Sequence, residues 1–70
     1  MALNATDIGK RIQKLRLAKG LTQQGLADEI GFTLSMIWKV ESGARIPSID
    51  TFVVLAEFFC VSLDYIVLGK

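Results

Sequence analysis

Few side chains in this sequence could carry a chemical reaction. The chain has no histidine, and its single cysteine, Cys60, stands between apolar neighbours. A paired nucleophile and base, or a Cys/His metal site, therefore cannot be assembled. The sequence also has no glycine-rich loop of the kind that cradles phosphates. We expect a protein that binds a partner rather than an enzyme, with no cofactor and no metal ion.

The charged side chains are distributed unevenly, although the formal net charge is only +1. Residues 1–20 hold five basic residues against one acidic residue, and residues 46–70 hold one basic residue against three acidic ones. The five basic residues are Lys10, Arg11, Lys14, Arg16 and Lys19. A basic first segment could attract nucleic-acid phosphates, but an ordinary solvated helix face has the same composition. Charge alone leaves both interpretations open.

The elements that position these residues are predicted to be helices. The 70 residues suit one small domain over residues 1–70, and a 51% hydrophobic content predicts a folded chain. Cap residues, glycines and apolar spacing mark the helix ends. They predict five short helices: from a Thr6 or Asp7 cap to Lys19, from Thr22 to Ile30, from Thr33 to Ser42, from Ser48 to about Phe59, and from Ser62 to Gly69. Short connections between them predict a compact all-α fold.

The second and third predicted helices form the most informative pattern. The segments TQQGLADEI, GFT and LSMIWKVES follow one another over residues 22–42. Ala27 is small enough for two helices to cross closely, and Gly31 can adopt the positive φ of a sharp turn. This spacing predicts a helix-turn-helix unit.

Several segments resemble the Cro and phage-repressor helix-turn-helix family, also called the xenobiotic-response-element family. In chain order they are IGKRIQKLRLAKGLTQ, LADEIGFT, IWKVESG, PSIDT and VSLDYIVLG. The resemblance implies a five-helix, lambda-repressor-like domain that binds double-stranded DNA with residues 33–42 in the major groove. It also implies a transcriptional regulator of the repressor class that acts as a homodimer on a pseudo-palindromic site.

The same resemblance assigns roles on the DNA surface. Leu34, Ser35 and Lys39 are expected to contact DNA bases, and Gln23, Ser42 and Arg45 are expected to contact the DNA backbone. Leu34 and Met36 stand where relatives often carry polar or basic residues, which reduces hydrogen-bonded readout and leaves contacts with thymine methyl groups. An alternative function stays open for this reason: a protein-interaction module of the same fold, binding a toxin or another regulator, with weak or lost DNA binding.

Other positions are expected to serve the fold. By the resemblance, Arg16 pairs with Glu41 and fixes the angle between the first and third helices. Trp38 is expected at the shoulder of the core or against Ile46. Gly25 replaces the glutamate that would complete a capping box with Thr22.

The last two helices carry more apolar residues than a core of this size needs. We expect a dimer interface there, at Phe58, Tyr65 and Leu68, with Val54 on the same surface. The lone cysteine cannot form an internal disulfide, and no uninterrupted apolar run suits a signal peptide or a spanning helix. The expected location is therefore the cytoplasm.

Overall fold

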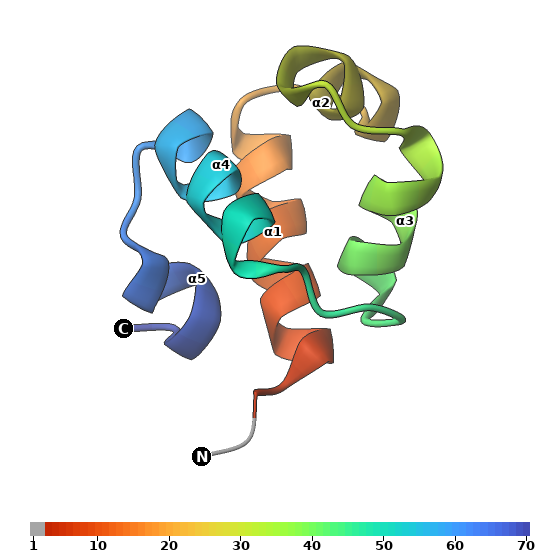
Figure 1. The fold of residues 1–70 in the computed structure, drawn as a ribbon. Helices are drawn as coiled ribbons and strands as arrows, with labels where there is room; N and C mark the ends of the chain where they lie inside the picture. The colour runs from red at the N-terminus through yellow and green to blue at the C-terminus, as the bar shows by residue number, and fades with distance from the viewer. Residues whose placement is uncertain (1–2) are drawn as a thin grey trace.

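The computed structural model describes residues 3–70, and it is helical throughout its regular structure (Figure 1). The elements are α1 (Ala5–Ala18), α2 (Gln23–Ile30), α3 (Leu34–Ser42), α4 (Ile49–Phe59) and α5 (Leu63–Leu68). The predicted all-α class is confirmed. None of these helices combines the length and the apolar composition that crossing a membrane would require.

Side-chain caps start the helices where the sequence predicted them. Thr22, Thr33, Ser48 and Ser62 each accept a hydrogen bond from the backbone N–H three residues later. Each cap satisfies one of the four N–H groups that a helix start leaves without a partner. Four of the five helices thus start at a Ser or Thr cap, one for each helix.

The first helix begins earlier than predicted. Its N-cap is Asn4, whose Oδ1 accepts from the N–H of Asp7 at 3.0 Å, so the prediction of a Thr6 or Asp7 cap was wrong. Asn, Asp and Thr are all favoured at this position, and the prediction considered only Thr6 and Asp7.

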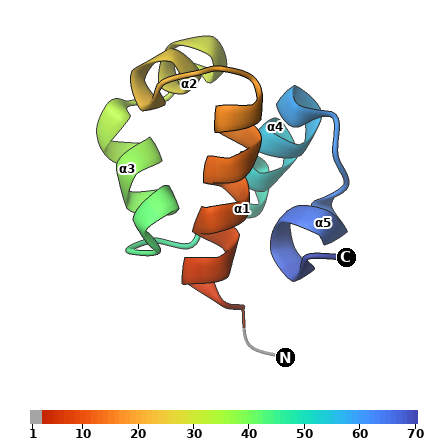
Figure 2. The same ribbon diagram turned by 180° about the vertical axis from the view of Figure 1, so that it is seen from behind.

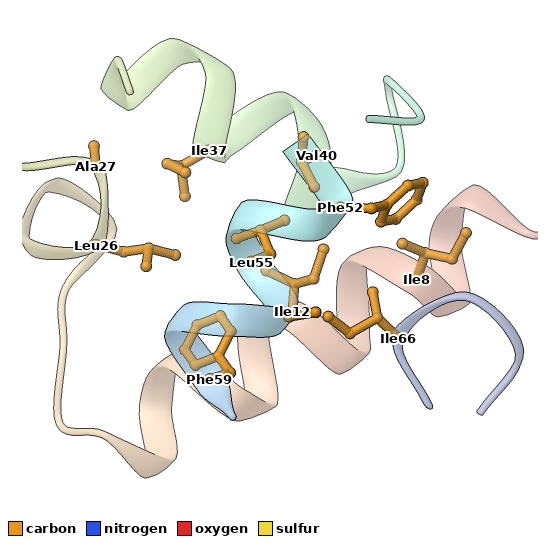
Figure 3. Packing of buried hydrophobic residues seen from close by; sticks show 11 residues of the cluster. Ile8, Ile12, Leu26, Ala27, Ile37, Val40, Phe52, Leu55, Phe59 and Ile66 are labelled. Atoms are coloured by element: carbon orange, nitrogen blue, oxygen red, sulfur yellow. The ribbon is translucent and has the colours of Figure 1, made fainter. Parts of the chain in front are cut away.

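The helix α1 lies at the centre of the fold. It packs against α3 on one side and against α5 on the other, and α4 crosses it, as the two opposite views show (Figures 1 and 2). The buried side chains between the helices form one continuous core (Figure 3). Its members are Ile8, Ile12, Leu26, Ala27, Ile37, Val40, Phe52, Leu55, Ala56, Phe59 and Ile66.

A glycine sets the distance between α1 and α3. Gly9 is buried, and a Cβ atom at this position would overlap the carbonyl oxygens of Val40 and Glu41. Those oxygens belong to the backbone of α3, so no side-chain rotation could relieve the overlap. The glycine therefore allows α3 to lie directly on α1.

An arginine of α1 holds the last helix. Arg11 donates from Nη1 to the carbonyl oxygen of Ile66 at 2.8 Å and to that of Val67 at 3.4 Å. These carbonyls lie at the end of α5, where a helix leaves acceptors unpaired and favours a positive charge. Arg11 therefore belongs to the fold, and the predicted basic surface of the first helix is smaller than its composition suggested.

Candidate nucleic-acid interface

The hairpin of α2 and α3 is fixed by its inner residues and its turn. Leu26 and Ala27 of α2 are fully buried against the core. Gly31 ends α2 with φ 74°, in the left-handed region that glycine adopts without strain. The N–H of Phe32 then donates to the carbonyl of Ala27 at 2.9 Å, which closes the end of the helix. The turn delivers the chain directly to the Thr33 cap of α3.

The helix α3 presents one face to the core and the other to solvent. Ile37, Val40 and Glu41 are buried. The solvent face holds five exposed residues: Leu34, Ser35, Trp38, Lys39 and Ser42. All three residues predicted to contact bases lie on this face. In both ribbon views α3 forms one flank of the molecule, with α5 on the opposite flank (Figures 1 and 2).

A buried ion pair anchors α3 to α1. Arg16 donates from Nε to Glu41 Oε2 at 2.6 Å and from Nη2 to Glu41 Oε1 at 3.1 Å. Its remaining guanidinium nitrogen, Nη1, donates to the carbonyl of Leu21 at 2.7 Å. The two-point geometry is that of a strong arginine–carboxylate pair, and it fixes the orientation of α3 as well as its distance.

The amide of Gln23 joins this pair. Its Nε2 donates to Glu41 Oε1 at 3.0 Å, and the side chain is partly buried. This amide group has a second N–H, and the main chain at the start of α2 offers further donors for the predicted contact with a DNA phosphate. Because Thr22 accepts from the N–H groups of Gly25 and Leu26, the earlier N–H groups of α2, at Gln23 and Gln24, remain available to an outside acceptor.

The loop after α3 brings a second positive charge to the same region. Gly43 turns the chain with φ 81°, and the N–H groups of Ala44 and Arg45 both donate to the carbonyl of Lys39, at 2.9 and 3.2 Å. Arg45 is exposed. Between residues 31 and 49 the exposed charges are Lys39 and Arg45, because Glu41 is buried in its pair. The surface formed by these residues is therefore positive.

One side chain on the α3 face differs from the sequence prediction, and another makes a hydrogen bond within the helix. Trp38 is 56% exposed, so its predicted place at the shoulder of the core was wrong, while the alternative contact with Ile46 stays a prediction. The Ser42 hydroxyl donates to the carbonyl of Lys39 at 3.1 Å, so its donor is used within the helix. The sequence could not show the exposure of Trp38, because it depends on the exact rotation of α3 about its axis.

The residues predicted to form a dimer interface are only partly available. Phe58 is half-buried, lies edge-on to Phe59 with ring centroids 5.1 Å apart, and carries the Lys19 Nζ at 5.0 Å from its ring centroid. Tyr65 also packs against the core, and Leu68 is half-buried. Phe58 and Tyr65 therefore contribute to the fold of the single chain.

A short helix held against the core, followed after a glycine turn by a helix with an exposed outer face, defines a helix-turn-helix protein. Residues 12–66 match the model of the helix-turn-helix family. The chain belongs to this family, and the match is of the Cro/C1 type. The resemblance seen in the sequence is confirmed.

Curated relatives include both a transcriptional activator and a transcriptional repressor. BcrR of Enterococcus faecalis, named a transcriptional activator, is 31% identical over 64 residues, which cover 91% of this chain and 31% of that protein. RstR of Vibrio cholerae, named a transcriptional repressor of a cryptic phage, is 37% identical over 57 residues, which cover 81% of this chain and 51% of that protein. The chain spans about a third to a half of the length of the first relatives it matches.

Solved structures share the whole arrangement of helices. The restriction-modification controller protein C.AhdI of Aeromonas hydrophila superimposes with a TM-score of 0.80 at 32% identity, over 89% of this chain and 94% of that chain. PlcR of Bacillus thuringiensis, solved in complex with the peptide PapR7 and DNA, superimposes with a TM-score of 0.80 at 32% identity, over 94% of this chain and 24% of that chain.

Proposed function

We propose that this chain regulates transcription by binding a specific duplex DNA sequence, with α3 in the major groove and α2 across the sugar-phosphate backbone. The observation that carries this proposal is the construction of α3. Its inner face is fixed by the core and by the Arg16–Glu41 pair, while its outer face is exposed and has only positive charge. A rigid, positive, exposed helix suits the major groove of DNA. PlcR, which shares this arrangement of helices and was solved in complex with DNA, supports DNA as the partner.

The surface divides into positioning and reading residues. Phosphates are proposed to be contacted by the main chain of Gln23, by the Arg45 guanidinium and by Ser42. These contacts set the register of the protein on the duplex. Leu34, Ser35 and Lys39 are proposed to meet base edges. Lys39 can donate to guanine O6 or N7, and Leu34 can contact a thymine methyl group.

A salt titration of DNA binding tests this function. Binding to a duplex should weaken linearly in log–log form as salt rises, because each neutralised phosphate releases condensed counterions. Arg45→Ala should reduce the slope by about one phosphate's worth. Lys70→Ala is the matched control, since the C-terminus lies beside α5, away from α3 (Figures 1 and 2). Binding without a salt slope, or equal slopes for both variants, would reject the proposal.

Homodimerisation is proposed through the surface of α4 and α5 that includes Phe58, Tyr65 and Leu68. Val54 is exposed one helical turn before Phe58, and exposed Val53 adjoins it. Exposed apolar residues at helical spacing are typical of an association surface. Val54→Glu should produce monomers without disturbing the core, and sedimentation should show it. A parent chain that is already monomeric at high concentration would refute this part.

The direction of regulation and the location of the protein are also proposals. We assign the chain to the repressor class, with a named phage repressor among its relatives and a named activator as well. A protein that binds DNA must have access to it, which agrees with the cytoplasmic location expected from the sequence. Expression of a reporter gene placed downstream of the selected site should rise when the gene for this chain is deleted, if the chain is a repressor. Expression should fall on the same deletion if the chain is an activator.

A second candidate function is a protein-interaction module of the same fold. The observation that favours it is the apolar part of the α3 face, where Leu34 is 44% exposed and Trp38 is 56% exposed. In that case the chain would bind a protein partner and show no salt-dependent affinity for random duplex DNA.

A further inference from the structure

The outer face of α3 is dominated by a side chain that the base-reading residues named above do not include. Leu34, Trp38 and Ser42 are four residues apart and form one row along the exposed side of the helix, next to the row of Ser35 and Lys39. Trp38 is in the middle of the first row and is more exposed than Leu34. Any duplex seated on this face must cover Trp38.

The hydrogen-bonding capacity around Trp38 is small. Ser42 already donates to the Lys39 carbonyl, and Glu41 is buried in its ion pair. Ser35 and Lys39 are the remaining polar side chains on this face of α3. The centre of the surface is therefore an indole ring, apolar except for its Nε1–H donor, with a polar row beside it and the positive Arg45 loop beyond the helix end.

The major groove offers one apolar group for such a ring to contact. Thymine carries a C5-methyl group on its major-groove edge, whereas cytosine presents an amine donor and purines present polar atoms. We propose that Trp38 is a specificity-determining residue that reads C5-methyl groups of pyrimidines, with Leu34 contacting a second such group one helical turn away. This inference rests on the DNA-binding function proposed above. The site should contain thymine, or 5-methylcytosine, opposite Trp38.

The charge distribution favours a duplex over a protein as the occupant. Lys39 lies in the row beside the apolar one, Arg45 lies in the loop just beyond the helix end, and no exposed acidic residue lies between residues 31 and 49. A groove with an apolar spot on its floor and phosphates along both walls is complementary to this surface. Protein partners that cover an apolar row have no such requirement for positive flanks.

The test replaces thymine by uracil, one position at a time, in a duplex selected from a random library. Uracil removes only the C5-methyl group. At the position under Trp38 the native chain should lose about fourfold in affinity, equivalent to the ~0.8 kcal/mol of one buried CH₂ group. In Trp38→Ala this loss should disappear, while the loss at the position under Leu34 should persist. In a duplex that carries cytosine at the position under Trp38, replacing this cytosine by 5-methylcytosine should strengthen binding by a similar factor.

The indole also reports on its own environment, because Trp38 is the only tryptophan in the chain. Its fluorescence should become protected from acrylamide quenching when the selected duplex is added. Duplex binding with no uracil effect, or with the same effect in Trp38→Ala, overturns this inference and leaves the proposed function standing. Absence of any binding to the selected or random duplexes overturns both.

Discussion

Replacing Arg16 by methionine should destabilise the fold more than any change at an exposed lysine. Methionine keeps the length and apolar character of the side chain but removes the guanidinium, which makes two hydrogen bonds to Glu41 and one to the Leu21 carbonyl. The side chains of Arg16 and Glu41 are only 8% and 3% exposed, so water cannot replace the lost donors. The Glu41 carboxylate would keep only the amide of Gln23 as a side-chain donor.

The expected size follows from that burial. Removing one partner of a buried pair costs ~3 to 5 kcal/mol, because a charge is left without compensation. A domain of this length has a total stability of roughly 4 to 10 kcal/mol, at the usual ~0.05 to 0.15 kcal/mol per residue. The loss would lower the unfolding midpoint by at least about 12 °C, since each kcal/mol shifts Tm by about 4 to 8 °C in small domains. Partial unfolding at 37 °C is therefore an expected phenotype of this variant.

The assay is thermal and urea unfolding followed by circular dichroism, with Lys14→Met as the matched control. Lys14 is exposed on the same helix, so its replacement should change stability by less than ~0.5 kcal/mol. The double variant Arg16→Met with Glu41→Leu removes both charges and should recover most of the loss. Equal midpoints for Arg16→Met and Lys14→Met would refute the reasoning, and so would a double variant as unstable as the single one.

The other stability predictions concern the contacts that fix the helices. Gly9→Ala should cost ~1 to 3 kcal/mol, because its Cβ would push α3 away from α1. Gly25→Ala should cost less than Gly9→Ala, because up to ~1 kcal/mol of helix propensity offsets the 3.1 Å approach of its Cβ to the Thr22 Oγ1 cap; urea midpoints compare the two. Arg11→Met should release α5 while leaving α1 to α4 in place, which hydrogen exchange would detect as lost protection confined to the last helix. Thr33→Ala should cost ~1 kcal/mol of stability by removing the α3 cap, and an unchanged midpoint would show that the cap is not used.

The helix positions could be predicted because their signals are local. A hydroxyl residue followed by an apolar run, with a glycine at its end, defines a helix without knowledge of the rest of the chain. The helices that start at Thr22, Thr33 and Ser62 followed this rule. The helix that starts at Ser48 has the same kind of cap but ends at Cys60, which takes the left-handed conformation with φ 57°. The start of α1 did not follow the rule, because several polar residues compete there and only the packed structure selects Asn4.

The roles that the sequence missed depend on contacts between distant residues. Arg11 reaches carbonyls 55 and 56 residues away, and its type and spacing match those of a solvent-facing basic residue. Gly9 has no turn to explain it, and its function appears only when α3 lies across it. Trp38 was misplaced because aromatic residues are more often buried than exposed, and only the rotation of α3 reveals its outward position.

The central claim is that α3 reads base sequence while the adjoining loop positions it on the backbone. It is tested most directly by measuring the affinities of Lys39→Ala and Arg45→Ala for the selected site and for a scrambled duplex. Lys39→Ala should lower the ratio of the two affinities, by ~1 to 3 kcal/mol if Lys39 contacts a guanine, because a base contact contributes only on the correct sequence. Arg45→Ala should weaken both affinities and leave their ratio unchanged. If the two variants have the same specificity ratio, α3 is not the reading helix.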